Sequence, residues 1–202
     1  QLDQLTGLYN RDEISSILVN LMEQARRQQA TLALLFLDLD HFKNINDALG
    51  HVTGDMVLQS VGKRLEDCLA EGDCVAHLSG DEFPILLNGI KDRAAAEDKA
   101  RHFLREIAKP FVIDGKEIYT TGSIGIVLYP DSASTIGDLM RNVDTAAYYA
   151  KEQGRDTFQF YTERLSDEAQ RRLEIETGLR RALESDQLKL FYQPKVDLGM
   201  RS

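Results

Sequence analysis

Residues 76 to 87 read AHLSGDEFPILL, and they place two acids, Asp81 and Glu82, between two short apolar runs. Apolar segments on either side of a Ser-Gly-Asp turn predict a β-hairpin with residues 79–82 at its tip. A plain hairpin turn is satisfied by Asp-Gly or Asn-Gly and has no need of a second carboxylate. Turn geometry therefore does not explain the second acid, which indicates a chemical role for the pair.

A second acidic stretch lies upstream in TLALLFLDLD, residues 31 to 40, where a continuous apolar run predicts a buried strand that ends in Asp38 and Asp40. If this strand lies beside the hairpin, Asp38 and Asp81 point at one another across the sheet. Two bare carboxylates that close would repel, and the pKa of one would rise unless a cation intervened. Oxygen ligands suit Mg²⁺ or Mn²⁺, and the lack of a suitable Cys/His set argues against zinc.

Simpler interpretations of the same acids stay open at this stage. Asp40 stands just before HFKNIN, residues 41 to 46, and an Asp in that place is often a helix N-cap. A Gly-Asp turn with a neighbouring Glu is also common in solvated loops.

Two further groups of residues could bind a nucleotide. Asn46 and Asp55 flank a glycine break in NINDALGHVTGD, and an amide with a carboxylate complements the edge of guanine. Alternatively they are the end of one helix and the start of the next. Lys151 and Arg155, four apart near a predicted helix end, could hold phosphate oxygens or stabilise the helix dipole. Lys43 would stand at a helix N-terminus, where free N–H groups favour a phosphate.

Composition limits the function classes. The 202 residues are 43% hydrophobic and 28% charged, as in a soluble globular domain, and the formal net charge of −9 argues against non-specific nucleic-acid binding. No apolar run approaches the length of a membrane span. Cys68 and Cys74 are too few for a disulfide framework, so we expect reduced packing residues and a cytoplasmic location. The first residue is Gln1, which suggests a piece of a longer protein that leaves room upstream for a sensor or a membrane anchor.

Helices and strands alternate over about 160 residues and predict one α/β layer domain. Helices are expected at residues 11–29, 41–50, 53–69, 93–108 and 135–155, and a closing strand at 157–161. Residues 110–130 predict a second hairpin with Asp114-Gly115 as its turn. Beyond residue 161 the chain is strongly charged and helix-forming, and LKLFYQPKVDL, residues 188 to 198, then predicts a strand.

Six motifs together are far more specific than any one of them. They are LTGLYNR (5–11), DLDHFKNINDALGH (38–51), GD (54–55), SGDEF (79–83), SIGI (123–126) and AKEQGR (150–155). In this order they resemble the GGDEF family, the diguanylate cyclases that make cyclic di-GMP from two GTP. LKLFYQPKVDL resembles the first strand of an EAL domain, the cyclic di-GMP phosphodiesterase. The resemblance implies a GGDEF domain at 1–162, a connecting helix at 163–187 and the start of a truncated EAL domain at 188–202.

The resemblance also implies a fold and a site. The fold would be α/β, α+β layered, with a central, mostly antiparallel five-stranded sheet flanked by helices, similar to polymerase palms and class III nucleotide cyclases. It implies a Mg²⁺ or Mn²⁺ cofactor, GTP as substrate, a homodimer for catalysis and an attached EAL domain, with no nucleic acid and no membrane contact. The implied metal ligands are Asp38, the Leu39 carbonyl, Asp81 and Glu82, the implied catalytic residues are Glu82 and Asp81, and the implied substrate-binding residues are Asn46, Asp55, Phe42, Lys43, Lys151 and Arg155.

Departures from the family pattern keep a rival hypothesis open. Ser79 replaces the first glycine of the signature, which is tolerated if the backbone there has a negative φ, and Pro84 removes a backbone donor from the hairpin. The stretch Ala70-Glu71-Gly72-Asp73 lacks the Arg of the family's product-inhibition site, so we expect no tight binding of cyclic di-GMP there. The rival is a catalytically lapsed GTP-binding domain that regulates an attached phosphodiesterase. A purely structural dimerisation domain leaves the coincidence of acids unexplained.

Overall fold

The computed structural model describes residues 1–185. The helices in this range are α1 (Arg11–Gln28), α2 (Phe42–Leu49), α3 (His51–Asp67), α4 (Arg93–Ile107), α5 (Ile136–Glu152) and α6 (Glu163–Glu184). The strands are β1 (Thr31–Leu39), β2 (Cys74–Val75), β3 (Glu82–Ile90), β4 (Phe111–Ile113), β5 (Lys116–Ile118), β6 (Gly122–Tyr129) and β7 (Thr157–Phe160). Internal contacts divide the chain into two units, residues 1–166 and 167–202. The predicted strand at 188–198 lies outside the described residues.

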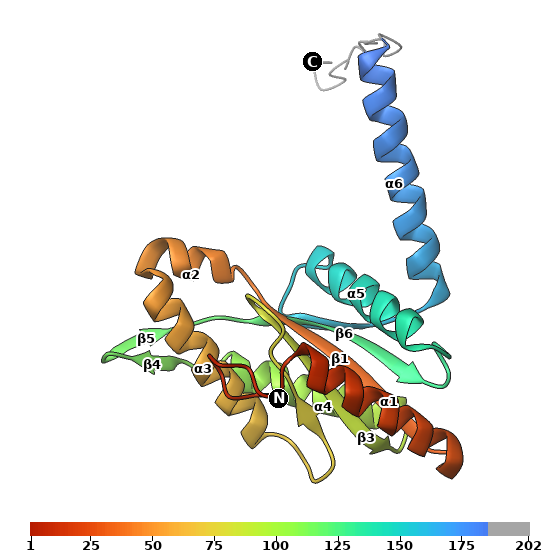
Figure 1. The fold of residues 1–202 in the computed structure, drawn as a ribbon. Coiled ribbons are helices and arrows are strands. Elements are labelled where there is room, and N and C mark those ends of the chain that lie inside the picture. The colour runs from red at the N-terminus through yellow and green to blue at the C-terminus, as the bar shows by residue number, and fades with distance from the viewer. Residues whose placement is uncertain (186–202) are drawn as a thin grey trace, which may run out of the picture. The chain divides into compact units, whose positions relative to one another are not determined.

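Five strands form the central sheet of the first unit in the order β2-β3-β1-β6-β7 (Figure 1). Neighbouring strands are antiparallel except for the parallel pair β6 and β7. The expected α/β fold with a mostly antiparallel five-stranded sheet flanked by helices is therefore confirmed. β1 lies at the centre of the sheet, which explains its continuous apolar sequence: both of its faces are covered.

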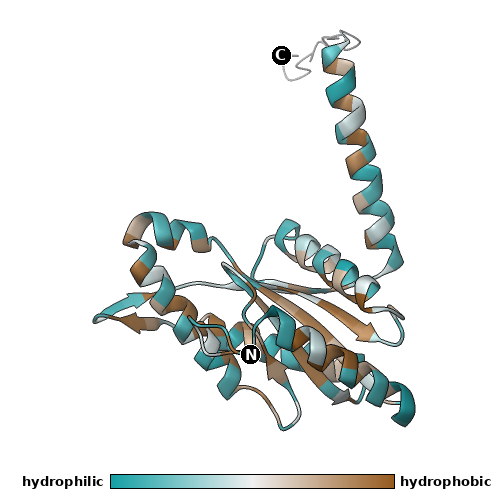
Figure 2. Cartoon of the chain, viewed as in Figure 1, coloured by the Kyte–Doolittle hydropathy of each residue, from teal (hydrophilic) through white to brown (hydrophobic). Residues whose placement is uncertain are grey.

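The two faces of β1 belong to two apolar clusters because successive side chains alternate across a strand. Leu35 and Leu37 pack with α3, α4 and the β4–β5 hairpin, whereas Leu34 and Phe36 pack with α1 and α5. Figure 2 shows the result, with apolar colour concentrated on the central strands and a mixture of colours on the covering helices. The sheet is thus held rigidly between helices, and the ends of its strands are fixed in space.

Helix starts follow capping rules that can be read from sequence. The Asn10 side chain accepts from the Glu13 N–H at α1, and Asp92 accepts from the Ala95 N–H at α4. The Thr135 hydroxyl does the same for α5. These local hydrogen bonds explain why the predicted helix starts agree closely with the structure.

The predicted hairpin over residues 110–130 is only partly correct. Asp114 and Gly115 do form its turn, with φ values of 49° and 75°, but β4 pairs with the short β5 alone. The chain then enters β6, which leaves the hairpin and pairs with β1 in the central sheet. Eight consecutive buried residues make β6 a better partner for the core than for a surface ribbon.

Both cysteines are free, as expected: Cys74 is buried and Cys68 half-buried. Burial raises the pKa of the Cys74 thiol to about 12, so this thiol stays protonated and is a packing group. Within residues 1–185, no helix has the length and apolar character needed to cross a membrane.

Candidate active site

Asp38 and Glu82 lie directly opposite each other across the β1–β3 ladder. Asp38 is the last residue but one of β1, and Glu82 is the first residue of β3. Opposed residues of an antiparallel pair point to the same face of the sheet. The predicted juxtaposition of the first strand's end with the signature hairpin is therefore present, although the acid facing Asp38 in the ladder is Glu82 rather than the Asp81 that we expected.

Asp81 and Leu39 are joined through their backbones. The Leu39 N–H donates to the Asp81 carbonyl at 3.1 Å, next to the Asp38–Glu82 pair. Asp81 also contributes to the electrostatics of Asp38, since its negative charge opposes ionisation of the Asp38 carboxyl. The three acids and the last peptide of β1 thus occupy one end of the sheet.

The Asp38 carboxylate is buried and paired with a lysine. Its side chain is 14% exposed, and the Lys151 ammonium lies 2.6 Å from Oδ1. Within residues 1–185, Oδ1 has no hydrogen-bond partner besides this ion pair. Burial is the largest influence and, with the charges of Asp81 and Glu82, it outweighs Lys151 and raises the pKa of Asp38 to about 6.

These properties match what a cation-binding carboxylate requires. A buried carboxylate in a cluster of negative charge is stabilised by a hard divalent ion, and carboxylate and carbonyl oxygens suit Mg²⁺ or Mn²⁺. Across residues 1–185, however, no three His, Cys, Asp or Glu side chains are already close enough together to hold a metal ion. The kinds of ligand atom present suit such an ion, but the acidic side chains have to move closer together to bind it.

The raised pKa of Asp38 gives a prediction with a defined sign. A carboxyl whose pKa rises to about 6 on folding, from an ordinary 3.8, favours the folded state below pH 3.8 and loses that contribution as the pH rises to about 6. Asp38→Asn removes the cost of keeping this carboxyl ionised in the folded state. The difference in Tm between the variant and the unsubstituted chain should therefore favour the variant by roughly 2–4 °C more at pH 7.5 than at pH 4.5.

Metal addition supplies the second half of that test. Millimolar Mg²⁺ or Mn²⁺ at pH 7.5 should raise the Tm of the unsubstituted chain and leave the Asp38→Asn variant unchanged, because the variant lacks the buried charge. Differential scanning fluorimetry with and without EDTA measures both effects. Equal metal responses of the two proteins would contradict the assignment of Asp38 as a ligand.

Asp40 has a structural role, and its interpretation as a helix N-cap was wrong. The cap position of α2 is His41, with φ 56° and no side-chain cap hydrogen bond. Asp40 instead accepts from the Ser123 hydroxyl on one oxygen, and from the Thr121 hydroxyl and the Asp156 N–H on the other, at 2.6–3.0 Å. It joins the end of β1 and the start of β6 to the segment after α5, which carries Arg155 and follows the last turn with Lys151.

Asn46 and Asp55 occupy neighbouring helices, as their spacing predicted. Asn46 lies in α2 and is half-buried, while Asp55 lies in α3 and is exposed. Asn46 packs against Gly54, the residue before Asp55: a Cβ placed there would stand 1.8 Å from Asn46 Oδ1. The Asn46 amide thus occupies the space that a side chain at position 54 would fill.

Gly54→Ala should therefore displace the Asn46 side chain without breaking the fold. The severe clash falls on the end of the flexible Asn46 side chain, while the Phe42 ring at 3.3 Å has to give by only a few tenths of an ångström. Ala is also the better helix former by about 1 kcal/mol. We expect the Tm to be maintained and the affinity for GTP to fall about tenfold, the loss of roughly one hydrogen bond. Fluorescence titration with a labelled GTP analogue measures this, and Gly178→Ala in α6, where nothing lies within 4 Å, is the control. Unchanged GTP affinity in Gly54→Ala would remove Asn46 from the site.

The remaining predicted substrate residues are divided between two elements. Phe42 is buried as the first residue of α2, and Lys43 follows it, exposed. Lys151 lies in the last turn of α5, but Arg155 is not in the helix, which ends at Glu152. Arg155 has a left-handed φ of 65°, and its N–H donates to the Ala150 carbonyl at 3.2 Å. Arg155 therefore lies beyond the end of the helix, which the sequence placed at Gly154 and the structure places two residues earlier.

The departures in the signature are accommodated by the backbone. Ser79 does not have a positive φ, whereas Gly80 does, at 57°. The serine therefore causes no backbone strain. Pro84 faces Phe36 of β1, and its carbonyl accepts from the Ala76 N–H on the β2 side. The missing proline donor thus points toward the short edge strand β2, whose ladder with β3 is only two residue pairs long.

Asp73 of the product-inhibition stretch is used structurally. Its carboxylate accepts from the N–H groups of Ala70 and Asn88 at 3.1 Å, and Lys99 Nζ lies 3.5 Å away. With the side chain only 5% exposed and these partners in place, Asp73 closes the loop before β2.

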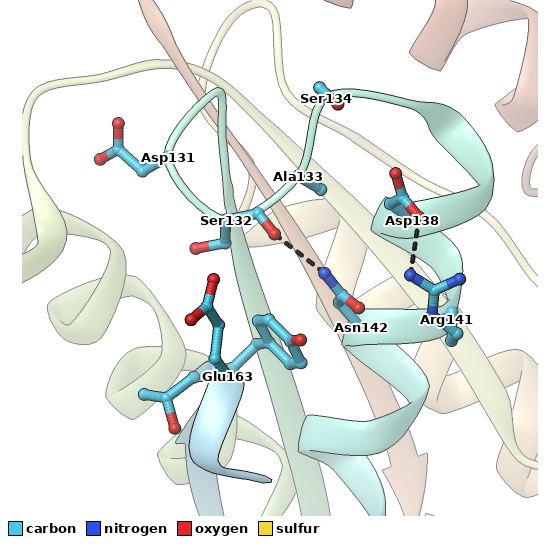
Figure 3. Close-up of a pocket in the computed structure, with 10 residues that line it drawn as sticks. Asp131, Ser132, Ala133, Ser134, Asp138, Arg141, Asn142 and Glu163 are labelled. Atoms are coloured by element: carbon cyan, nitrogen blue, oxygen red, sulfur yellow. Dashed lines mark hydrogen bonds and ion pairs between the residues drawn. The ribbon is translucent and has the colours of Figure 1, made fainter. Parts of the chain in front are cut away.

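A hollow of about 450 Å³ lies apart from these residues, and Figure 3 shows the side chains that line it. It follows the C-terminal end of β6, whereas Asp38 pairs with Ser123 near the start of that strand. Asp131, Asp138 and Glu163 surround it, and its cation Arg141 is paired with Asp138 at 2.7 Å. The excess of negative charge makes this hollow a poor site for a triphosphate.

Comparison with known proteins identifies the family. Residues 1–157 match the family described as "Diguanylate cyclase, GGDEF domain". The chain is 38% identical over 197 residues to the cyclic di-GMP phosphodiesterase NbdA of Pseudomonas aeruginosa, covering 98% of this chain and 25% of NbdA. It is 41% identical over 194 residues to the bifunctional diguanylate cyclase/cyclic di-GMP phosphodiesterase MucR of the same organism, covering 96% of this chain and 28% of MucR.

A solved structure agrees in fold. The GGDEF domain of TpbB (YfiN) from Pseudomonas aeruginosa has a TM-score of 0.82 and 37% identity, with 84% of this chain and 99% of that chain covered. The chain belongs to the GGDEF family. It spans about a quarter of the length of the two curated relatives.

Proposed function

We propose that this chain is a diguanylate cyclase domain, which condenses two GTP molecules into cyclic di-GMP and releases pyrophosphate. The observation that carries the proposal is the pairing of Asp38 with Glu82 across adjacent strands, beside Asp81, which leaves Asp38 buried among negative charges. Membership of the GGDEF family and the bifunctional name of MucR support it.

The reaction is a phosphoryl transfer performed twice. The 3′-oxygen of one GTP forms a bond to the α-phosphorus of the other, and the bond from that phosphorus to the β-phosphate oxygen breaks. The 3′-hydroxyl proton goes to a base, and pyrophosphate carries away the displaced negative charge. Repeating the step in the opposite direction closes the cyclic dinucleotide.

The protein's part is to hold the nucleotide and to accept the proton. Asn46 and Asp55 bind the guanine edge, the amide donating to its carbonyl and the carboxylate accepting from its N–H groups. Lys43, Lys151 and Arg155 bind the triphosphate. Glu82 is the group that takes the 3′-hydroxyl proton or helps to hold the metal.

The residues that would hold Mg²⁺ or Mn²⁺ are Asp38, Asp81, Glu82 and the Leu39 carbonyl. The bound ion supplies Lewis-acid polarisation of the phosphate and neutralises its charge. Lys151 now compensates the charge of Asp38 at 2.6 Å. Once another cation balances Asp38, the Lys151 ammonium is available to a phosphate oxygen.

One domain of this size presents one such site, so the reaction requires two domains facing each other. We therefore propose a homodimer as the catalytic form. The rate per domain should rise with protein concentration until the dimer is complete, because the encounter of two loaded domains is bimolecular.

The deciding experiment is incubation of the chain with GTP and Mg²⁺ or Mn²⁺ over a range of protein concentrations, with pyrophosphate and cyclic di-GMP measured separately. Formation of both at a rate per domain that rises with concentration supports the proposal. GTP binding without either product, also in the longer protein, would overturn it.

A second candidate is a GTP-binding domain that regulates an attached cyclic di-GMP phosphodiesterase. The name of NbdA, a phosphodiesterase 38% identical over nearly the whole chain, favours it. We infer from the sequence resemblance that an EAL domain follows in the longer protein. If GTP changes cyclic di-GMP hydrolysis by that protein while no product is made, the regulatory function is the correct one.

A further inference from the structure

His77 is a buried histidine with an acceptor at each ring nitrogen. It is 5% exposed and lies between the edge strand β2 and the signature turn. Nδ1 lies 3.0 Å from Asp3 Oδ1, and Nε2 lies 3.0 Å from the Gly80 carbonyl oxygen. A carbonyl oxygen can only accept, so Nε2 must carry a proton and donate it to Gly80.

The state of Asp3 then decides the charge of the ring. Asp3 Oδ1 also accepts from the Thr6 N–H at 2.9 Å and from the Thr6 hydroxyl at 2.7 Å. Partial burial opposes the charge of Asp3, but the Thr6 hydrogen bonds and His77 outweigh it, and the pKa of Asp3 is lowered. An ionised Asp3 has no proton to give, so both contacts of His77 are hydrogen bonds only when both of its nitrogens carry protons.

One further neighbour of the ring is apolar. The Phe83 ring of β3 has its centroid 5.0 Å from that of His77 and is uncharged. Asp81 and Glu82 follow Gly80 in the chain, so the turn that accepts from His77 carries two acids of the proposed site.

Backbone contacts attach the N-terminal segment to the same place. The His77 N–H donates to the Tyr9 carbonyl at 3.0 Å, and Tyr9 also bridges to Ala76. The segment is closed on itself, since the Asp3 N–H donates to the Leu8 carbonyl at 2.7 Å. These bonds attach the N-terminal segment to the residues that lead into the signature turn.

We propose that His77 is a positioning residue: as a doubly protonated link between Asp3 and the Gly80 carbonyl, it sets the position of the turn that carries Asp81 and Glu82. The N-terminal segment and the acidic end of the sheet then behave as one coupled unit. As regards turnover, this inference rests on the proposed cyclase function. The charge of the ring and the order of the turn are independent of it.

The first test needs no substitution and no activity. Nitrogen NMR of histidine-labelled chain, assigned with a His77 variant, reports whether each ring nitrogen carries a proton at pH 7. Two protonated nitrogens at His77 support the proposal. A neutral ring at pH 7 would overturn it.

The second test uses three variants. His77→Gln provides one amide donor group in place of two ring donors, Asp3→Asn removes the acceptor charge, and His77→Arg keeps a cation that donates to both oxygens. Amide hydrogen exchange at residues 78–82 should accelerate in His77→Gln and Asp3→Asn and stay near the original rate in His77→Arg. Original exchange rates in both disruptive variants would refute a positioning role, and Asp3→Asn remains informative if His77→Gln fails to fold.

Turnover supplies the functional readout. The kcat of His77→Gln should fall by about 100-fold with the KM for GTP changed by less than about threefold, because misplaced acids affect chemistry more than nucleotide binding. His77→Arg should recover most of that loss. If the unsubstituted chain makes no product, the cyclase proposal fails while NMR and exchange still decide the role of His77. Equal kcat values for the unsubstituted chain and His77→Gln would contradict the inference.

Discussion

Glu82→Gln should lower cyclic di-GMP formation by at least about 100-fold while GTP affinity changes by less than about threefold. The amide has the shape of the carboxylate but can neither accept the 3′-hydroxyl proton nor supply a negative charge to a cation. Glu82 lies opposite Asp38 at the start of β3, away from the α2–α3 region that is assigned to guanine. The substitution should therefore separate chemistry from nucleotide binding.

The measurement is initial-rate product formation with GTP binding followed on the same protein. Glu71→Gln is the matched control, because Glu71 is an exposed acid in the loop that precedes β2. Full turnover in Glu82→Gln, from a chain that makes product, would show that the reacting centre has been assigned wrongly. A comparable loss in Glu71→Gln would show that the effect is a general one of charge.

Gly125→Ala should lower the free energy of unfolding by about 3 kcal/mol or more, or prevent folding. Gly125 is in the middle of β6, between Phe36 of β1 and Gln159 of β7. A Cβ there would stand 2.4 Å from the Ala147 nitrogen and 2.4 Å from the Val143 oxygen, both backbone atoms of α5. Backbone cannot turn aside as a side chain does, so the whole helix must move away from the sheet.

Urea denaturation followed by circular dichroism measures this effect, and Gly122→Ala in the same strand is the control. A Cβ at Gly122 would meet Leu37 at 3.4 Å, an ordinary van der Waals distance. We expect the control to unfold within about 1 kcal/mol of the unsubstituted chain. Equal denaturation midpoints for the two variants would mean that α5 can shift at little cost.

The helices and strands were predictable because their signals are local. Asn10, Asp92 and Thr135 cap helices through hydrogen bonds to residues three positions ahead. The hairpin over residues 110–130 was misjudged because the sequence of β6 suits either a surface ribbon or the core. Pairing of β6 with β1 depends on which segments compete for the edge of β1 in the folded sheet. No local sequence pattern reports the outcome of that competition.

The same distinction applies to the residues of the predicted site. Antiparallel pairing places Asp38 opposite Glu82, beside Asp81, at one end of the sheet. By contrast, Asp40 was misassigned because its partners Thr121, Ser123 and Asp156 lie about 80 to 116 residues further along the chain.

The amino-acid sequence by itself determined the order of the motifs, the extent of the apolar strands and the kinds of side chain that reach the end of the sheet. Folding decided which of those groups touch: Lys151 against Asp38, the Asn46 amide in the space over Gly54, and His77 between Asp3 and Gly80. Such contacts join distant parts of the chain, and their distances depend on how whole helices pack on the sheet. Local propensity fixes each element, but only the packed sheet and helices fix the few ångströms between side chains on which charge and chemistry depend.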